Sequence, residues 1–380
     1  MKNPYLCVIP AKAGTLWVHA LRDSRFRGSD DDYEFVDTPS REGMQGVQDA
    51  RRLLRCARNL RLRYTAKSRN RRSLMPCALL VLVVMELIVN SPGHAEPVCG
   101  FECGPFLGVG RFASSEIMEC SGLVVSRKNP GILWVHNDSG DRARLFAVEE
   151  DGSLRGVYHL ASAKAADWED LARGPCADPA KECLYVGDIG DNERRRSKIQ
   201  VYRIEEPLVP VQGPPVEIIL KGVERFDCKY PDGPHDAETL LVDPATGIPY
   251  LITKESEGST PVYRFPGNPA SGKILTLEKA AILPALWSLT GGDVTQDGSM
   301  VLLRDYFSAY GYPRLEKGPL SEAFNSSPCR VPLGLEEQGE ALGIAPSGIA
   351  IYTASEGLQG PIHKARCTPS GERKGSSGEP

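Results

Sequence analysis

The chain lacks the local motifs of several enzyme classes. Neither a G-x-S-x-G elbow, nor a phosphate-binding P-loop, nor an H-E-x-x-H pair occurs in its 380 residues. These absences disfavour a serine hydrolase built on a nucleophile elbow, a nucleotide triphosphatase and a zinc protease of the H-E-x-x-H type. A paired C-x-x-C spacing is also missing, which disfavours a structural zinc site.

The chain also lacks an uninterrupted hydrophobic run of membrane-spanning length. Its longest apolar stretch begins at Ala78, is broken by Glu86 and then resumes only briefly. About 12 apolar residues are too few for a hydrocarbon core of ~30 Å. With arginines before it and the small residues Gly93 and Ala95 after it, segment 75–95 resembles a secretory signal peptide cleaved after Ala95. An uncleaved anchor is the alternative, disfavoured by Glu86, so we expect no stable membrane span after cleavage.

The first 74 residues differ in charge from the rest of the chain. They hold 16 Lys and Arg against 8 Asp and Glu, whereas residues 96–380 carry a net charge of about −11. Such a change of sign within one chain indicates a boundary. We interpret residues 1–74 as a basic extension, either disordered or translated from DNA upstream of a true start near Met75. The alternative is a basic amphipathic helix over residues 47–63 that binds nucleic acid or a membrane surface.

What the chain does contain is a fivefold repeat of an acidic residue, an apolar strand, a turn, a second apolar strand and a polar tip. The spacing between successive repeats is 47 to 69 residues, which fits a four-stranded propeller blade of ~40–50 residues plus loops. We therefore predict an all-β fold, a five-bladed β-propeller over residues 96–367, with a disordered tail at 368–380. Six blades, one of them degenerate, is the alternative. The repeats begin at Glu119, Glu169, Glu238, Asp293 and Glu340.

The outer strands of the blades are less regular in the sequence. Third and fourth strands are predicted at 144–148 and 156–160 in the first repeat, and at 200–204 and 216–220 in the second. The last repeat has too little chain for a fourth strand, while residues 106–112 are unassigned ahead of the first repeat. If this N-terminal segment supplies the missing outer strand, the ring closes without a free sheet edge.

Cysteine usage is consistent with export. Eight of the 11 cysteines follow the predicted cleavage site, and an even number in an exported chain favours disulfides. Cys176 and Cys183 flank a polar loop between two predicted strands, so we predict a bridge there. A bridge from Cys99 or Cys103 to Cys367 would join the two ends of the ring. The remaining pairings stay open.

The direction of the strands places the acidic residues. In an antiparallel blade the innermost strand begins at the edge where the second strand ends, so both acidic positions of every repeat face one mouth of the central channel. Many carboxylates near one axis raise each other's pKa or require a cation, and a hard ion, most simply Ca²⁺, suits oxygen ligands. The alternative is that these side chains brace the ends of strands. The candidate metal ligands are Glu119, Asn137, Asp138, Glu169, Asp170, Asp188, Asn192, Glu238, Asp293 and Glu340.

Few groups are available as a general base. Only four histidines follow residue 95, and His136 and His235 lie beside polar tips. Either could act as a base beside a metal-bound water, although packing is the alternative role for each. We take His136 and Asp188 as the candidate catalytic residues.

Parts of the chain resemble a known group of proteins. The segments Glu119-Cys-Ser-Gly-Leu, Leu133-Trp-Val-His-Asn-Asp-Ser-Gly-Asp and Asp167-Trp-Glu-Asp-Leu-Ala, with those beginning at Leu184 and Val201, are similar to an uncharacterised family of exported bacterial β-propellers. More remotely, the pattern of an acid followed by a turn is similar to calcium-binding propellers of the gluconolactonase, paraoxonase and phytase kinds. That second resemblance implies an axial calcium at Glu119, Asn137 or Asp138, Asp188 or Asn192, and Glu238. It transfers no reaction, and those families have six blades.

Together these features predict an exported binding module. We expect a monomer, periplasmic or secreted from a bacterium, whose acidic mouth binds Ca²⁺ and a small-molecule, sugar or cell-envelope ligand, and which does not bind nucleic acid. The alternative function is a metal-dependent hydrolase of lactones, esters or phosphate esters.

Overall fold

The structure is a computed structural model that describes residues 8–11, 14–17, 99–267, 269, 272–284, 286, 288–314 and 318–369. The chain divides into two compact units, Met1–Pro92 and Gly93–Pro380. In the first unit, strands β1 (Val8–Ala11) and β2 (Gly14–Trp17) form an antiparallel hairpin. The predicted signal peptide at 75–95 and residues 370–380 of the predicted tail at 368–380 lie outside the described residues, whereas residues 368 and 369 belong to the last strand of the structure. Among the described residues, no helix is long and apolar enough to cross a membrane.

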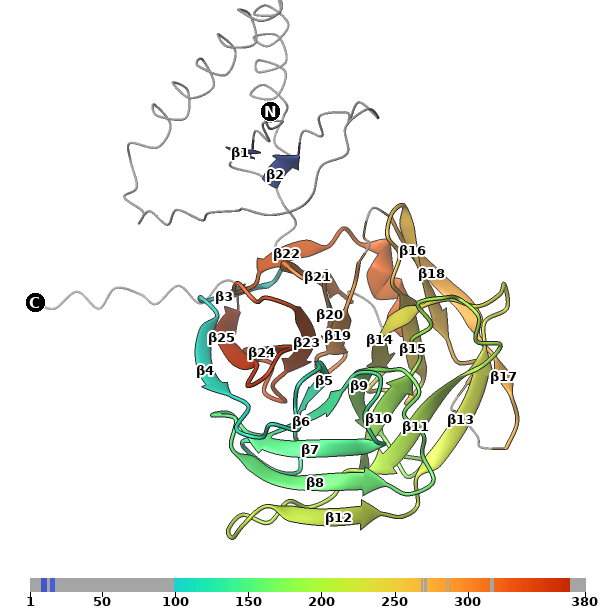
Figure 1. The fold of residues 1–380 in the computed structure, drawn as a ribbon. Helices are drawn as coiled ribbons and strands as arrows, with labels where there is room; N and C mark the ends of the chain where they lie inside the picture. The colour runs from blue at the N-terminus through green and yellow to red at the C-terminus, as the bar shows by residue number, and fades with distance from the viewer. Residues whose placement is uncertain are drawn as a thin grey trace, which may run out of the picture. The chain divides into compact units, whose positions relative to one another are not determined.

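The second unit is a ring of five sheets, which confirms the predicted five-bladed β-propeller (Figure 1). The innermost strands of consecutive blades lie side by side, and that of blade 5 lies beside that of blade 1. Within each blade the four main strands are antiparallel. The strands of each blade are given from the innermost outwards. Blade 1 contains β5 (Cys120–Val125), β6 (Ile132–Asn137), β7 (Arg144–Glu149) and β8 (Leu154–Leu160), and blade 2 contains β9 (Trp168–Pro175), β10 (Glu182–Asp188), β11 (Ile199–Glu205) and β13 (Glu224–Lys229). Blade 3 contains β14 (Ala237–Val242), β15 (Pro249–Thr253), β16 (Ser259–Arg264) and β18 (Glu278–Pro284), blade 4 contains β19 (Gly291–Val294), β20 (Met300–Arg304), β21 (Ser308–Pro313) and β22 (Cys329–Pro332), and blade 5 contains β23 (Gly339–Ile344), β24 (Ala350–Ser355), β25 (Pro361–Pro369) and β4 (Leu107–Arg111).

The N-terminal part of the propeller closes the ring, as the sequence predicts. Strand β4 pairs antiparallel with β25 and supplies the outer strand that the last repeat lacks. A short strand, β3 (Phe101–Cys103), extends the pairing along the end of β25. The predicted option of a bridge at this seam is confirmed by the disulfide between Cys103 and Cys367, and a second disulfide joins Cys99 to Cys329 of blade 4.

Two further strands extend blades 1 and 2 beyond four strands. Strand β12 (Val216–Leu220) pairs parallel with β8 of blade 1, and β17 (Leu275–Thr276) pairs parallel with β13 of blade 2. The prediction that residues 216–220 form the fourth strand of blade 2 is therefore wrong, because β13 takes that place. Each added strand comes from a loop of the following blade and covers the outer edge of the blade before it.

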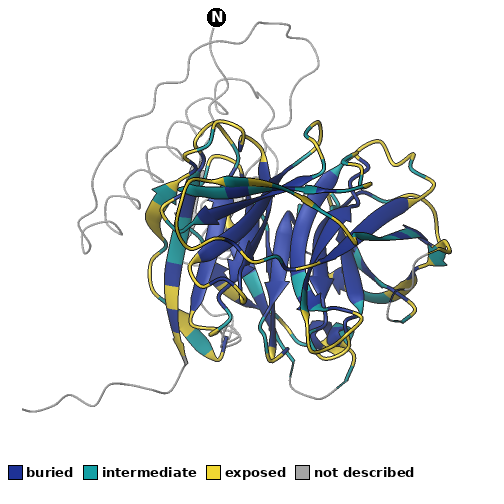
Figure 2. Ribbon diagram, turned by 90° about the horizontal axis from the view of Figure 1, so that it is seen from below, coloured by how far each residue is buried: buried dark blue, intermediate teal, exposed yellow. Residues whose placement is uncertain are grey.

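The hydrophobic core consists of five clusters, one at each interface between neighbouring blades. The innermost and second strands of blades 1, 3, 4 and 5 are buried at every position. The sequences of such strands are continuous apolar runs because both faces of each strand pack against other blades. The outermost strands are more exposed, and β8 and β22 alternate between buried and less buried residues. Figure 2 shows the buried strands in dark blue inside a shell of exposed loops.

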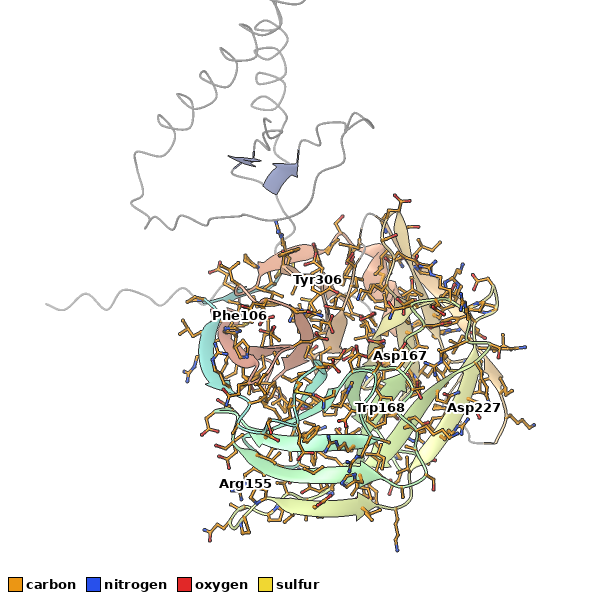
Figure 3. The ribbon with its side chains drawn as sticks, in the orientation of Figure 1. Phe106, Arg155, Asp167, Trp168, Asp227 and Tyr306 are labelled. Atoms are coloured by element: carbon orange, nitrogen blue, oxygen red, sulfur yellow. A yellow bond between two sulfur atoms is a disulfide. The ribbon has the colours of Figure 1, made fainter. Side chains whose placement is uncertain are left out.

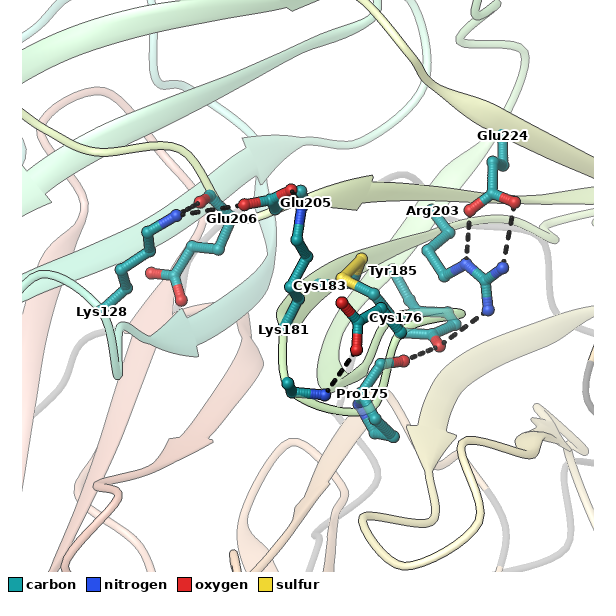
Figure 4. The surroundings of a disulfide bond; sticks show 12 residues. Lys128, Pro175, Cys176, Lys181, Cys183, Tyr185, Arg203, Glu205, Glu206 and Glu224 are labelled. Atoms are coloured by element: carbon teal, nitrogen blue, oxygen red, sulfur yellow. Dashed lines mark hydrogen bonds and ion pairs between the residues drawn. A yellow bond between two sulfur atoms is a disulfide. The ribbon is translucent and has the colours of Figure 1, made fainter.

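The second blade contains the predicted disulfide between Cys176 and Cys183, at the loop from β9 to β10. Figure 4 shows the polar contacts beside it: Lys181 pairs with Glu205 at 2.8 Å, and the Tyr185 hydroxyl donates a hydrogen bond to the Pro175 carbonyl at 2.5 Å. The two cysteines of the propeller that form no disulfide, Cys120 and Cys228, are both buried, and burial raises the pKa of their thiols. Three disulfides in one domain are typical of proteins in an oxidising environment.

Candidate functional site

The polar segments of the repeat surround one mouth of the ring. Cys120 at the start of β5 pairs with Asn137 at the end of β6, and Trp168 pairs with Asp188 in blade 2. The corresponding residues pair in blades 3 and 5. The start of each innermost strand and the end of the second strand thus meet at the same edge, as expected for antiparallel strands.

Five carboxylates of blades 1, 2 and 3 converge at this mouth. Asp138, Asp167 and Glu169 form one group, and Glu169, Asp236 and Glu238 form another. Within each group, one carboxylate oxygen per residue lies within 4.8 Å of those of the other members. Glu169 is common to both groups and joins them into one set, which we call the acidic cluster. Figure 3 shows Asp167 near the centre of the ring.

A β-bulge at the start of the innermost strand positions the glutamates of this mouth. The register of blades 2, 3 and 5 skips one residue of that strand, which is Glu169, Glu238 and Glu340 respectively. A bulge of this kind re-aims a side chain. Blade 1 has the same bulge at Ser121, whose hydroxyl donates a hydrogen bond to the Glu169 carbonyl. The described strands β19 and β20 of blade 4 pair without a skip.

The structure corrects the alignment of the repeat at two positions. Glu119 lies two residues before the bulge of blade 1, on the exposed surface, where its carbonyl accepts a hydrogen bond from the Asp138 amide at 2.7 Å. Asp293 does not occupy the position of Glu169, because it lies opposite Leu302 in the regularly paired part of β19 and not at a bulge. Sequence similarity could not reveal this difference because a bulge shifts the register by one residue and flips the side chain to the other face.

Asp170 and Asp293 brace neighbouring blades. Both are buried, and each accepts a hydrogen bond from an amide of the next innermost strand: from Leu240 at 2.9 Å for Asp170 and from Ile344 at 2.7 Å for Asp293. Burial raises the pKa of both carboxyls. These contacts match the bracing role that the sequence offers as the alternative to metal binding.

Burial and mutual repulsion dominate the electrostatics of the acidic cluster. Burial, reinforced by the neighbouring carboxylates, raises the pKa of Asp167 to about 6 and that of Glu169 well above its usual range. Burial also raises the pKa of Glu238 to about 7, although Lys254 opposes the shift. The pKa values of Asp138 and Asp236 are raised mainly by burial as well. The cluster therefore favours bound protons or a bound cation over five free charges.

The basic residues around the mouth already have carboxylate partners. Lys254 donates a hydrogen bond to Glu238 at 3.0 Å, and its ammonium lies 5.5 Å from the centre of the Tyr306 ring. Although burial acts to lower it, the Glu238 carboxylate raises the pKa of Lys254 overall. The basic residues of blade 2 are paired outside the acidic cluster, Arg196 with Asp188 at 2.7 Å and Arg194 with Glu255 at 2.7 Å.

The two candidate catalytic residues are buried behind the mouth. The ring of His136 packs edge-on against Trp168, with centroids 5.5 Å apart, and its Nδ1 lies 2.8 Å from the Asn137 carbonyl oxygen. Burial lowers the pKa of His136 to about 4. Asp188 accepts hydrogen bonds from Arg196 and, at 3.1 Å, from the amide of Asp167. Asp188 therefore holds the segment that carries Asp167 in place.

The remaining candidate ligands lie apart from the acidic cluster. The amide of Asn137 is fully engaged, because its oxygen accepts from the Met118 and Glu119 amides and its nitrogen donates to Glu116 and Asp141. Asn192 is exposed. Glu340 lies at the same mouth, where it accepts a hydrogen bond from the Tyr306 hydroxyl at 3.3 Å.

Two members of the acidic cluster, Asp167 and Asp236, were not among the residues predicted from the sequence. Each precedes a predicted glutamate by two positions, in the segments Asp167-Trp-Glu and Asp236-Ala-Glu. This shared D-x-E pattern is the signal that could have identified them. Asp236 accepts a hydrogen bond from the Asp191 amide at 2.8 Å, which fixes the loop of blade 2 against blade 3.

Comparison with known proteins gives likenesses of structure only. No protein-family model matches the chain, and no curated protein matches it. One similar solved structure is that of the WD40 repeats of RRP9, with a TM-score of 0.35 and 10% identity over 69% of this chain and 100% of that one. Another is that of U3-55K, with a TM-score of 0.33 and 11% identity over 64% of this chain and 80% of that one. The propeller assignment rests on the strand pairing of this chain itself. The resemblance to exported bacterial propellers stays a prediction.

Proposed function

We propose that this propeller is a binding module whose mouth holds a divalent cation, most simply Ca²⁺, in the acidic cluster. The observation that carries the proposal is the convergence of five carboxylates, three of them buried, on two overlapping groups. Among the described residues, no Lys or Arg forms an ion pair with Asp138, Asp167, Glu169 or Asp236. A cation would relieve the repulsion that raises the pKa values of the cluster.

The spacing of the oxygens suits this ion. Ca²⁺ binds oxygen ligands at about 2.3–2.6 Å, so two of its ligands lie at most roughly 5 Å apart. The oxygens of each group lie within 4.8 Å of one another. Gly190 supports the same arrangement, because a Cβ atom at this position would overlap Glu169 Oε1 and lie 2.6 Å from Asp167 Oδ2. The absence of a side chain there leaves room for both carboxylates.

Binding, rather than hydrolysis, is the activity that we propose. The hydrolase alternative needs a base that reaches a ligand at the mouth, and His136 and Asp188 are both buried and hydrogen-bonded within the protein. The three disulfides support export, and we extend the proposal to the bacterial periplasm or the external medium.

Calcium titration of the mature domain tests the proposal. We expect isothermal titration to show Ca²⁺ binding, and saturating Ca²⁺ at a hundredfold excess over Kd to add about 2.7 kcal/mol to the free energy of unfolding. For a domain of this size that corresponds to a rise in Tm of roughly 5–10 °C. Glu169→Gln removes the carboxylate common to both groups and should abolish the rise.

A matched control and a contrary outcome complete the experiment. Glu257→Gln changes an exposed glutamate in the loop between β15 and β16 and should respond to Ca²⁺ as the unaltered protein does. If EDTA and saturating Ca²⁺ give the same Tm, the cluster holds protons instead of a cation and the proposal fails.

A further inference from the structure

Three large apolar side chains are exposed around the acidic mouth. Met118 precedes β5 and is 51% exposed, Phe307 lies between β20 and β21 and is 75% exposed, and Leu358 lies between β24 and β25 and is 67% exposed. They belong to blades 1, 4 and 5, whereas the acidic cluster lies on blades 1, 2 and 3. We call these three residues the apolar rim.

Hydrogen bonds connect the apolar rim to the mouth. The amide of Gly357, next to Leu358, donates to the Met118 carbonyl at 2.6 Å, so the two loops lie together. Phe307 follows Tyr306, whose ring it contacts and whose hydroxyl donates to Glu340. Each rim residue is thus one or two positions from a residue that lines the mouth.

Two carboxyl groups lie beside this rim. Glu340 is buried and Glu356 is half-buried. Burial and the nearby Glu356 carboxylate raise the pKa of Glu340 to about 8, so the two carboxyl groups share a proton in the absence of a partner. In the described part of the chain neither forms an ion pair with Lys or Arg, since Lys254 is already bonded to Glu238. A basic group from outside can replace the shared proton and find two carboxylate acceptors here, next to apolar surface.

We propose that the apolar rim and the Glu340–Glu356 pair bind a peptide segment of a protein partner that carries a Lys or Arg flanked by apolar residues. The inference rests on the proposed role as a binding module, but it uses carboxylates that lie outside the acidic cluster. Charge complementarity selects a basic segment, because a cation that takes the place of the proton shared by Glu340 and Glu356 gains charge-assisted hydrogen bonds from its own N–H groups to both carboxylates. Exposed aromatic and aliphatic side chains around such an anchor are typical of interface hot spots.

The test uses fluorescein-labelled peptides with one variable triplet in a Gly-Ser context. The triplets are Leu-Lys-Leu, Leu-Gln-Leu, Leu-Glu-Leu and Ser-Lys-Ser, and binding is measured by fluorescence anisotropy. We expect the Leu-Lys-Leu peptide to bind at least tenfold more tightly than the Leu-Gln-Leu and Ser-Lys-Ser peptides, since each loses one of the two interactions. The Leu-Glu-Leu peptide should bind most weakly.

Variants locate the binding surface. Phe307→Ser and Glu356→Gln should each weaken binding of the Leu-Lys-Leu peptide by about tenfold. Ile219→Ser is the matched control, because Ile219 is 67% exposed on β12, at the outer edge of blade 1. Equal binding of all four peptides, no binding of any, or an equal loss in the Ile219→Ser variant would overturn the proposal.

Two further measurements separate the possible outcomes. Each titration is run in Ca²⁺ and in EGTA, and Ca²⁺ binding is measured in the Phe307→Ser variant. Peptide binding that persists in EGTA supports the rim even if the cation site fails, and Ca²⁺ binding without peptide binding removes the rim alone. Light scattering after size exclusion shows whether the protein forms dimers. A dimer that Phe307→Ser disrupts would assign the rim to a second copy of the chain and overturn the peptide proposal.

Discussion

The variant Glu238→Gln tests the electrostatics of the mouth. Glu238 is 3% exposed, and burial raises its pKa to about 7 from an ordinary value of 4.5 despite the hydrogen bond from Lys254 at 3.0 Å. Gln has nearly the shape of the protonated carboxyl group but cannot ionise. The variant therefore keeps position 238 neutral at every pH, as the protonated Glu238 is at low pH.

The sign of the effect follows from linkage. A carboxyl group whose pKa is higher in the folded than in the unfolded chain holds its proton more tightly when folded, so its stabilising contribution is present below pH 4.5 and is lost as the pH rises towards 7. One pKa unit corresponds to about 1.4 kcal/mol, which gives a loss of roughly 2 kcal/mol between about pH 5.5 and pH 8. With cations chelated, we expect the unaltered protein to lose about 2 kcal/mol more over this interval than Glu238→Gln does.

Urea unfolding in EDTA at a series of pH values measures this difference, with the fluorescence of the buried Trp134 and Trp168 as the signal. The other carboxyl groups titrate in both proteins, so the difference between the two pH profiles reports Glu238. Glu257→Gln is the matched control and should follow the profile of the unaltered protein. If Glu238→Gln has that same profile, or if stability rises from pH 5.5 to pH 8, the raised pKa and the reasoning built on it are refuted.

Three further predictions concern the carboxylate that braces blades 2 and 3, the space that Gly190 leaves beside the acidic cluster, and the disulfide at the closure of the ring. Asp170→Ala should lower the free energy of unfolding in urea by roughly 2–5 kcal/mol, because it leaves the buried Leu240 and Leu171 amides without their acceptor at about 1–3 kcal/mol each, and should leave Ca²⁺ affinity in calorimetry unchanged. Gly190→Ala should reduce Ca²⁺ affinity in calorimetry at least tenfold, because the added Cβ overlaps a carboxylate of the cluster; unchanged affinity would remove Gly190 from the site. Replacing Cys103 and Cys367 together with Ser should lower the free energy of unfolding by about 2–5 kcal/mol, and an unchanged urea midpoint would show that strand pairing alone closes the ring.

Much of the fold could be predicted from the sequence because propeller blades repeat. The hairpins of the inner strands are continuous apolar runs with turn residues between them, and these local signals give five blades. The strand with which a given strand pairs cannot be predicted from such local signals. Residues 216–220 have a clear strand pattern, but β12 pairs with β8 of the preceding blade. Pairing of this kind depends on which sheet edge is open in the folded ring, and local pattern does not contain that information.

The site was predicted in part for a similar reason. Glu169, Glu238 and Asp138 were expected at the mouth and belong to the acidic cluster. Asp170 stands next to Glu169 in the chain, yet the bulge directs the two side chains to different surroundings, one between blades and one at the mouth. The acidic residues and the end of the ring at which they lie can be predicted from the sequence. Which of their side chains point to the central axis depends on the bulges, which local sequence does not reveal.

The closing strand of the propeller has a consequence for the order of synthesis. Cys103 and Cys367 are 264 positions apart. At about 5–20 residues per second, a ribosome that has made Cys103 therefore needs roughly 13–50 s to reach Cys367. During that interval β4, which carries the apolar residues Leu107 and Val109, has no β25 to pair with. Strand β4 is therefore synthesised before all the other main strands of the blades and finds its pairing partner only after the last of them has been made. A factor that binds unpaired strands has that time in which to act on the nascent chain.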